Sequence, residues 1–333
     1  MKFESRVPLR LSLAGGGTDV EPYASIFGSK VVNFTINKYI CGKSSQVSDE
    51  KPRISIQINN LFEGSSQNKT NFESQLENVL KKKFEKYKNQ NLKLNITSPV
   101  LAGSGLGASS AIIVCILDLI YKNFGETLSL NTLAQEAWNV ERLDMRIKGG
   151  FQDHYSAAFG GFNIFTQERS MINSTSITLT KSFQEQLEDS LLLIDLKKKR
   201  SGENIIEDQE RRVKNRDITT LTALHEQIAI VDSLVTSLNE EDLNSVAKLL
   251  NKAWQSKKDF SPMITSPEID RVHDLLIQSG SLGVKISGAG GGGHMFALVP
   301  KESKFAIVNK LESIGLTTSD IKLEKKGCTT WMN

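Results

Sequence analysis

Residues 92–120 contain the feature that most constrains this fold, a glycine-rich loop between an expected strand and an expected helix. Residues 92–96 alternate apolar and polar side chains, which is the period of a half-buried strand. The last ten residues form an apolar run after two serines, and serine favours helix N-termini. Between them, Gly103, Gly105 and Gly107 leave the backbone open to a ligand. Because helix N-termini carry unpaired N–H groups and a positive dipole end, the loop predicts an anion site.

Two further glycine-rich stretches follow expected strands. The first, Gly15–Gly17, comes after residues 1–13, in which apolar and polar side chains alternate. The other, Gly288–Gly293, comes after the short apolar segment 284–287 and precedes a second apolar segment, 294–299. In each case the chain turns next to a strand at residues that allow close backbone approach.

Neither of the two familiar phosphate-binding motifs accounts for these loops. A P-loop needs a lysine after its glycines, and residues 103–110 have none. The spacing of Gly288, Gly290 and Gly293 matches the dinucleotide fingerprint, which requires a helix after the glycines. The residues that follow favour a strand instead, so the stretch is predicted to be a strand–turn–strand.

The rest of the chain alternates between strand and helix patterns. The expected strands cover residues 1–13, 31–48, 54–58, 92–96, 162–165, 191–195, 284–287, 294–299 and 321–325. Expected helices cover residues 76–89, 111–120, 132–146, 151–159 and 302–314, with mostly helical residues between 203 and 279 and a polar, mixed segment at 170–188. This alternation indicates an α/β or α+β protein. Its length suits two domains, with a boundary expected near residue 185.

Composition excludes several classes of protein. A net charge of +3 is too small to indicate nucleic-acid binding, and no apolar run is long enough to span a membrane. The charged N-terminal residues lack the apolar core of a signal peptide. Three scattered cysteines without a Cys-x-x-Cys pair fit a reducing cytoplasm. We therefore expect a cytoplasmic enzyme or binding protein for a small molecule, and the sequence leaves a homodimer open.

Together the three glycine-rich stretches resemble the GHMP small-molecule kinase superfamily. The matching segments are 8–19, 103–111 and 285–293, in the order and near the places that the superfamily has them. The resemblance implies an α+β fold of two domains: an ATP-binding, ribosomal protein S5 domain 2-like domain at 1–185 and a ferredoxin-like domain at 186–333. It also implies ATP and Mg²⁺ as cofactors and a small-molecule substrate.

The resemblance assigns the ATP phosphates to the second glycine-rich stretch. The implied phosphate-binding residues are Gly103, Ser104, Gly105, Leu106, Gly107, Ala108, Ser109 and Ser110. A serine at the end of this loop and Glu141 would hold Mg²⁺, whose preferred ligands are hard oxygens. Ser110 is the matching serine, with Ser109 as the alternative. Judged from the residues alone, Glu141 would be an exposed helix glutamate paired with Arg142 or Arg146.

Asp153 matches the aspartate that, in galactokinase-like members, accepts the proton of the sugar hydroxyl or orients that hydroxyl. Arg10 matches a basic residue beside that aspartate, which balances charge at the γ-phosphate. The residues alone also allow Asp153 to cap the helix expected at 151–159, a role that is compatible with catalysis.

The resemblance also implies which residues bind the substrate. These are Gly17, Thr18, Asp19, Gln152, Lys285, Gly288, Gly290, Gly291 and Arg200. A second phosphate on the substrate needs cations, for which the candidates are Lys197, Lys198, Lys199, Arg200 and Lys285. The run 197–200 could equally be a solvated surface.

Within the superfamily, residues 14–19 with Tyr23 resemble kinases of D-glycero-D-manno-heptose 7-phosphate and the related fucokinases. Galactokinases usually have Gly-Glu-His-Thr-Asp there. The resemblance implies ATP-dependent phosphorylation of the anomeric hydroxyl to give the 1,7-bisphosphate, for nucleotide-activated heptose and bacterial surface polysaccharide. Three alternatives stay open: a fucokinase-like kinase of an unphosphorylated sugar, a non-catalytic sugar- and ATP-binding relative, and a dinucleotide-binding oxidoreductase.

Overall fold

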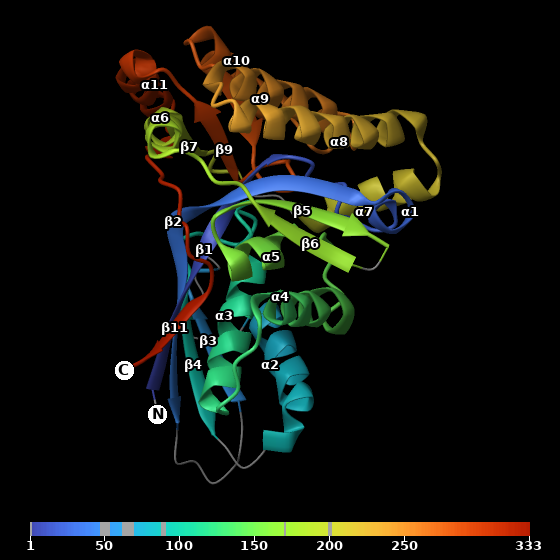
Figure 1. Ribbon diagram of the computed structural model, residues 1–333, viewed down its shortest axis with the longest axis vertical. Helices are drawn as coiled ribbons and strands as arrows, with labels where there is room; N and C mark the ends of the chain where they lie inside the picture. The colour runs from blue at the N-terminus through green and yellow to red at the C-terminus, as the bar shows by residue number, and fades with distance from the viewer. Residues whose placement is uncertain (1, 47–53, 62–69, 88–90, 170, 199–201) are drawn as a thin grey trace.

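The structure is a computed structural model that describes residues 2–46, 54–61, 70–87, 91–169, 171–198 and 202–333. Within these residues the strands form one seven-stranded and one four-stranded sheet (Figure 1). Helices cover parts of both sheets, and the two chain ends lie side by side at one end of the molecule. The mixed α+β class expected from the sequence is confirmed.

The seven-stranded sheet is built mainly from the first half of the chain. Its main order is β11-β1-β2-β4-β3, while β5 pairs with β2 and β6 pairs with β5. The strands are β1 (Lys2–Ala14), β2 (Ser29–Gln46), β3 (Ile54–Asn59), β4 (Leu92–Thr97), β5 (Phe162–Glu168), β6 (Met171–Ser176) and β11 (Thr329–Met332). All described pairs are antiparallel except β3 with β4.

Helices α2 to α5 lie on one side of this sheet (Figure 1). Their bounds are α2 (Asn71–Lys83), α3 (Ala108–Asn123), α4 (Leu130–Trp138) and α5 (Gln152–Phe159). Helix α3 is apolar on every side and almost wholly buried, as expected of a helix in the centre of a core. A short π-helical stretch, Asn139–Asp144, continues α4. Two single-turn helices, α1 (Tyr23–Phe27) and Glu85–Tyr87, complete this half.

The four-stranded sheet has the order β10-β7-β9-β8. Its strands are β7 (Leu191–Asp195), β8 (Gly283–Ile286), β9 (His294–Leu298) and β10 (Thr317–Ser319). The accompanying helices are α6 (Lys181–Ser190), α7 (Gly202–Lys214), α8 (Ile218–Asn239), α9 (Leu243–Lys258), α10 (Pro267–Gln278) and α11 (Lys301–Ser313). Counted from β7, the spatial order is 4-1-3-2, which is the ferredoxin-like arrangement. The stretch Gly288–Gly293 joins β8 and β9, so the predicted strand–turn–strand is confirmed.

The last expected strand, 321–325, was wrong. Leu323 forms only an isolated bridge with Ile36, and the regular strands are β10 before it and β11 after it. The segment runs beside the middle of β2, where the Asn37 N–H donates to the Lys322 oxygen and the Glu324 N–H donates to the Thr35 oxygen, and this contact does not extend into a ladder. The polar segment 170–188 contains β6 and α6, which had not been predicted.

The expected domain boundary, between residues 185 and 186, falls inside α6 and stays a prediction. The C-terminal strand β11 returns to the first sheet and pairs with β1. No helix within the described ranges combines the length and the apolar character that crossing a membrane requires.

Candidate active site

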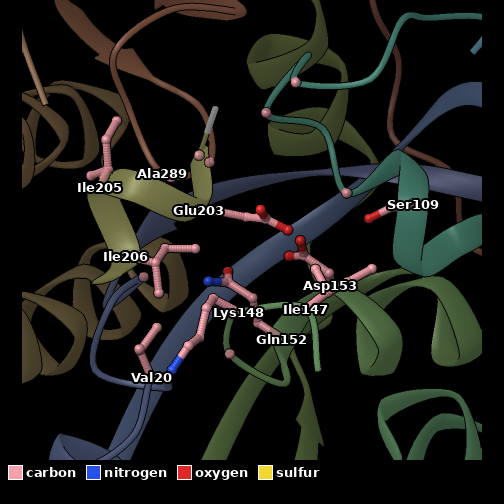
Figure 2. A pocket seen from close by; sticks show the side chains of 18 of the residues that line it. Val20, Ser109, Ile147, Lys148, Gln152, Asp153, Glu203, Ile205, Ile206 and Ala289 are labelled. Atoms are coloured by element: carbon pink, nitrogen blue, oxygen red, sulfur yellow. The ribbon is translucent and has the colours of Figure 1, made fainter. Parts of the chain in front are cut away.

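The three glycine-rich stretches meet at one cavity of about 540 Å³, shown from close by in Figure 2. The cavity is lined by residues of β1, the N-terminus of α3, the segment 141–153, α7 and α9. Of the residues expected at the site it is lined by Arg10, Gly17, Asp19, Gly103, Ser104, Gly105, Gly107, Ala108, Ser109, Glu141, Gln152, Asp153 and Gly288. Segments from both halves of the chain therefore build one site.

Backbone contact between the second and third stretches depends on glycine. Gly105 has φ +77°, and a Cβ there would lie 2.4 Å from the Ser287 oxygen. A Cβ on Gly288, which has φ +71°, would lie 2.6 Å from the Gly105 Cα. The His294 N–H donates to the Ser104 oxygen at 3.0 Å. Any larger residue would separate the loops, so these glycines fix the relation between the two halves of the site.

The loop 103–107 leads into α3 as the sequence predicts. Gly107 is the N-cap residue in the left-handed conformation, and the helix begins at Ala108. Leu106 has no exposed surface, and its oxygen accepts a hydrogen bond from the Arg10 N–H at 3.1 Å. Leu106 therefore anchors the loop to β1 and does not line the cavity.

Arg10 and Asp153 form a pair at the centre of the site. Arg10 Nε donates to Asp153 Oδ1 at 2.7 Å, and Nη2 lies 2.6 Å from the same oxygen. Arg10 Nη1 also donates to the Gly105 oxygen at 2.6 Å and to Ser287 Oγ at 3.3 Å. Helix α5 is preceded by Phe151 at its N-cap, so Asp153 does not cap it. The Asp153 carboxylate is instead held by Arg10 and lines the cavity.

Glu141 is completely buried beside the first turn of α3. Ser109 Oγ donates to Oε1 and Ser110 Oγ to Oε2, both at 2.6 Å. His154 Nε2 lies 2.6 Å and Arg142 Nη1 lies 3.3 Å from Oε2. Burial raises the pKa of Glu141, but the charge of Arg142 and the contacts with His154 and Ser109 outweigh it and lower the pKa overall. The exposed glutamate that the residues alone suggested is not what the structure has.

The oxygens around Glu141 suit a hard cation. A carboxylate offers about four lone-pair positions, and Oε2 already has three contacts whereas Oε1 has one. Ser109 lines the cavity, whereas Ser110 is 1% exposed and does not. Among the described residues no group of three acidic, His or Cys side chains could hold a metal. A Mg²⁺ ion here would therefore complete its shell with phosphate oxygens and water, as Mg²⁺ commonly does.

Asp19 is fixed by hydrogen bonds from the first glycine-rich stretch and from the residue before Asp153. Its Oδ1 accepts from the Gly17 N–H at 3.0 Å and from Gln152 Nε2 at 3.2 Å, and Oδ2 accepts from the Gln152 N–H at 3.2 Å. A Cβ on Gly150 would lie 1.9 Å from Oδ2, so glycine is required there. Burial raises the pKa of Asp19, and the charge of Asp153 adds to that effect.

Comparison with known proteins identifies this arrangement. Residues 74–161 match the family described as "GHMP kinases N terminal domain", and residues 234–315 match "GHMP kinases C terminal". The chain is 31% identical to the D-glycero-alpha-D-manno-heptose 7-phosphate kinase of Campylobacter jejuni, over 99% of this chain and 98% of the relative. The chain belongs to the GHMP kinase family.

Two solved structures resemble this GHMP kinase over its whole length. A D-glycero-D-manno-heptose 1-phosphate kinase from Bacteroides thetaiotaomicron has a TM-score of 0.80 at 25% identity, with 99% of each chain covered. A putative sugar kinase from Campylobacter jejuni has a TM-score of 0.76 at 28% identity, covering 99% of this chain and 98% of the other. Kinases of this family use ATP, so the site has to accommodate the nucleotide together with its phosphate acceptor.

Several residues expected at the site of this GHMP kinase lie elsewhere. Besides Leu106 and Ser110, the cavity lining does not include Thr18, Lys285, Gly290 or Gly291. Lys285 Nζ donates to the Ser12 oxygen at 2.9 Å, and its side chain is buried. Its position therefore does not support contact with substrate phosphate. Thr18 Oγ1 donates to the Gly15 oxygen at 2.8 Å and shapes the first loop.

Two of the cations proposed for a second phosphate, Lys197 and Lys198, also lie away from this cavity. Lys197 and Lys198 line a separate cavity of about 460 Å³, and each is paired with a carboxylate, of Asp195 and Glu268 respectively. Lys199 and Arg200 lie outside the described residues.

Besides Arg142, which was considered only as a partner of Glu141, three charged residues that line the cavity were missed by sequence reasoning. Lys148 follows the π-helical stretch, Glu203 belongs to the first turn of α7, and Lys257 belongs to the last turn of α9. Figure 2 shows the Glu203 carboxylate directed toward Asp153, with Lys148 on the other side of Gln152. Each lies in a charged helical or loop segment, a pattern that is typical of solvated surface. Only Lys148 has a sequence feature that could have indicated a site, because Gly149 and Gly150 follow it.

Proposed function

We propose that this GHMP kinase transfers the γ-phosphoryl group of ATP to the anomeric hydroxyl of D-glycero-D-manno-heptose 7-phosphate. The products would be the 1,7-bisphosphate and ADP. The observation that carries the proposal is the Arg10–Asp153 pair, which lies where the three glycine-rich stretches meet. The choice of heptose 7-phosphate as the acceptor is based on the full-length relative at 31% identity.

We assign the two substrates to different parts of the cavity. Leu61, Phe72 and Ala102 are apolar lining residues, of which Ala102 adjoins the loop 103–109, and they suit a nucleotide base. At the proposed sugar end, Asp19 and Gln152 offer polar groups that suit sugar hydroxyls. ATP would thus lie with its phosphates along the glycine loop and its γ-phosphate pointing toward Asp153.

In this arrangement the anomeric oxygen attacks the γ-phosphorus while the bond from that phosphorus to the ADP oxygen breaks. Asp153 accepts the hydroxyl proton, and Arg10 balances the charge that develops on the phosphoryl oxygens. A bound Mg²⁺ would neutralise the β- and γ-phosphates, with Ser109 Oγ and Glu141 Oε1 as protein ligands. We favour Ser109 over Ser110 because Ser109 lines the cavity.

A panel of acceptors tests the proposal. ADP release should be fastest with D-glycero-D-manno-heptose 7-phosphate when it is compared with fucose, galactose and mevalonate at equal concentration. Faster turnover of fucose would favour a kinase of an unphosphorylated sugar, and no turnover of any acceptor would favour a non-catalytic relative. The free thiols of Cys41, Cys115 and Cys328 fit a reducing cytoplasm. There the enzyme would supply activated heptose for surface polysaccharide.

Asp19→Ala should weaken sugar binding more than ATP binding. The Asp19 carboxylate is fixed by Gly17 and Gln152 at the sugar end, so its loss removes an acceptor for sugar hydroxyls. Titration calorimetry would measure both dissociation constants. We expect a rise of about 10–100-fold for the sugar, the cost of one hydrogen bond to a charged group. Equal weakening of sugar and ATP would point to misfolding of the site.

Lys148 is the cation that we assign to the substrate's own phosphate. Its Nζ lies 2.7 Å from Glu210 Oε2, and its side chain is 45% exposed at the edge of the cavity. Lys148→Met should raise KM for the sugar 7-phosphate by about 10–100-fold and leave KM for ATP unchanged.

Two further variants check the Lys148 assignment. Glu210→Gln frees Lys148 from its ion pair and should lower KM for the sugar phosphate. Lys30→Met removes a comparable exposed ion pair, with Asp232 at 2.6 Å, outside the cavity and should change neither constant. A normal KM for the sugar phosphate in Lys148→Met would rule out this role.

A further inference from the structure

The Lys257 ammonium is a buried cation at the wall of the active-site cavity. Lys257 lies in the last turn of α9, and its side chain is only 5% exposed. Nζ donates one hydrogen bond, to the Gly288 oxygen at 2.7 Å. Lysines are rarely buried without a charged partner, because removing an ammonium from water is costly. The Phe260 ring, whose centroid lies 5.9 Å from Nζ, compensates only part of that cost, so the charge of Lys257 needs a further explanation.

Counting donors shows that Lys257 has capacity left for a ligand. An ammonium has three N–H donors, and the described residues give Nζ one acceptor. Arg10, in contrast, uses Nε, Nη1 and Nη2 on Asp153, Gly105 and Ser287. Two donors of Lys257 are thus left at a cavity wall, whereas most of the Arg10 fork is occupied.

Four charged groups lie near Lys257. They are Asp19 after β1, Arg10 in β1, Asp153 in α5 and the buried Lys285 in β8, whose own pKa is lowered by burial and by the charges of Lys257 and Arg10. The pKa of Lys257 is lowered to about 8, mainly by burial and also by the charge of Arg10, while Asp19 and Asp153 oppose this shift. The ammonium is therefore mostly protonated at neutral pH. No carboxylate of the described residues forms a direct ion pair with it, so an anion from outside the chain can.

Lys257 and Arg10 each donate a hydrogen bond to one of the two glycine-rich loops that touch at Gly105 and Gly288. Arg10 binds the Gly105 oxygen and Lys257 binds the Gly288 oxygen, and the backbones of these two glycines touch. Arg10 belongs to the first sheet, while Lys257 belongs to a helix beside the second sheet. The two cations thus approach the Asp153 end of the cavity from different halves of the chain.

We propose that Lys257 donates hydrogen bonds to the phosphoryl group while that group moves from ATP to the acceptor. In phosphoryl transfer, charge is spread over three equatorial oxygens, and Arg10 alone has few donors left for them. Lys257 keeps its protons throughout, because the hydroxyl proton goes to Asp153. The proposal rests on the kinase reaction proposed above but not on the identity of the sugar. It makes turnover depend on both halves of the chain.

The competing explanation is structural, with Lys257 holding only the Gly288 loop. The variant Lys257→Met removes the donors, and Lys252→Met on the same helix removes an exposed ion pair with Glu226 as a matched control. Two affinities are then measured in the presence of an accepted sugar, for ADP and for ADP with aluminium fluoride, which mimics the phosphoryl group in transfer.

If Lys257 contacts that group, Lys257→Met lowers kcat by about 10²–10³-fold, the usual loss for one transition-state donor. It also weakens the aluminium fluoride complex while ADP affinity stays at the wild-type value. Equal weakening of both complexes, or an unchanged kcat, would overturn the proposal. Lys252→Met should match the wild type in every measurement.

A pH profile keeps the proposal testable if Lys257→Met folds poorly. Wild-type kcat/KM should fall as pH rises above about 8, because Lys257 loses its proton in the free enzyme. Lys257→Arg keeps the charge, and its profile should lose that alkaline limb; an identical limb in both proteins contradicts the proposal. The profile can be recorded with any sugar that the wild type accepts, so a wrong heptose assignment is told apart from a wrong role for Lys257.

Discussion

Replacing Asp153 with asparagine is expected to lower kcat by about 10²–10⁴-fold, the range for loss of a general base. An amide cannot accept the proton of the sugar hydroxyl, although it fills the same space beside Arg10. Because the proposed arrangement places Asp153 beside the transferring group and not the nucleotide base, the ATP dissociation constant should change little. Initial rates of ADP release at saturating ATP and sugar, together with ATP titration calorimetry, would measure both effects.

Glu203 provides the matched control for Asp153. It is a second carboxylate directed into the same cavity (Figure 2), but it is exposed and has no ion pair with Arg10. Glu203→Gln removes the same charge and should leave kcat within a few-fold of the wild-type value. A large loss in Glu203→Gln with a near-normal Asp153→Asn would transfer the role of base to Glu203.

Local patterns predicted the loops of this site because each loop is a local structure. The alternation in residues 92–96, the glycines after it and the apolar run beyond them define a strand, a turn and the start of α3. The same holds for β8, Gly288–Gly293 and β9. The sequence thus shows where glycine is present, although it does not show why. For Gly105 and Gly288 the reason is a backbone contact between residues 183 positions apart.

The orientation of individual side chains could not be predicted in this way. Ser109 and Ser110 are neighbours, yet only Ser109 lines the cavity, because that depends on how α3 is rotated against β1. Lys285 looked like a phosphate ligand, but β8 directs it to the Ser12 oxygen. Lys257 was not singled out in the sequence, and it is the packing of α9 that buries it. These differences arise from contacts between segments far apart in the chain.

The family resemblance supplied the residues that local patterns could not. Glu141 and Asp153 lie in ordinary helical segments, and nothing in their spacing distinguishes them from surface carboxylates. Their burial and partners, His154 for Glu141 and Arg10 for Asp153, become visible only in three dimensions. The cations for a second phosphate show the limit of such transfer, because Lys197 and Lys198 line a different cavity.

Glu141→Gln is expected to have the second large effect, on both Mg²⁺ dependence and stability. The variant removes the negative charge that accepts from Ser109 and Ser110 and that lies beside His154 and Arg142. Removing one partner of a buried ion pair costs about 3–5 kcal/mol of unfolding free energy. The Mg²⁺ concentration for half-maximal rate should rise by about 10–100-fold. Urea titration and rate measurements over a Mg²⁺ series would test each part.

Acid titration distinguishes the charge of Glu141 from its shape. The pKa of Glu141 is lowered in the folded protein, so its stabilisation is complete above the ordinary value of 4.5 and is lost as pH falls below it. Below that value, the unfolding free energy of Glu141→Gln should therefore depend less on pH than that of the wild type. The difference in unfolding free energy between the two proteins should become smaller as the pH falls. Glu136→Gln breaks the 2.5 Å ion pair between Glu136 in α4 and Lys83 in α2, neither of which lines the cavity, and should keep the wild-type Mg²⁺ requirement. A Glu141→Gln deficit that stays constant into acid would show that packing, and not the buried charge, stabilises this part of the site.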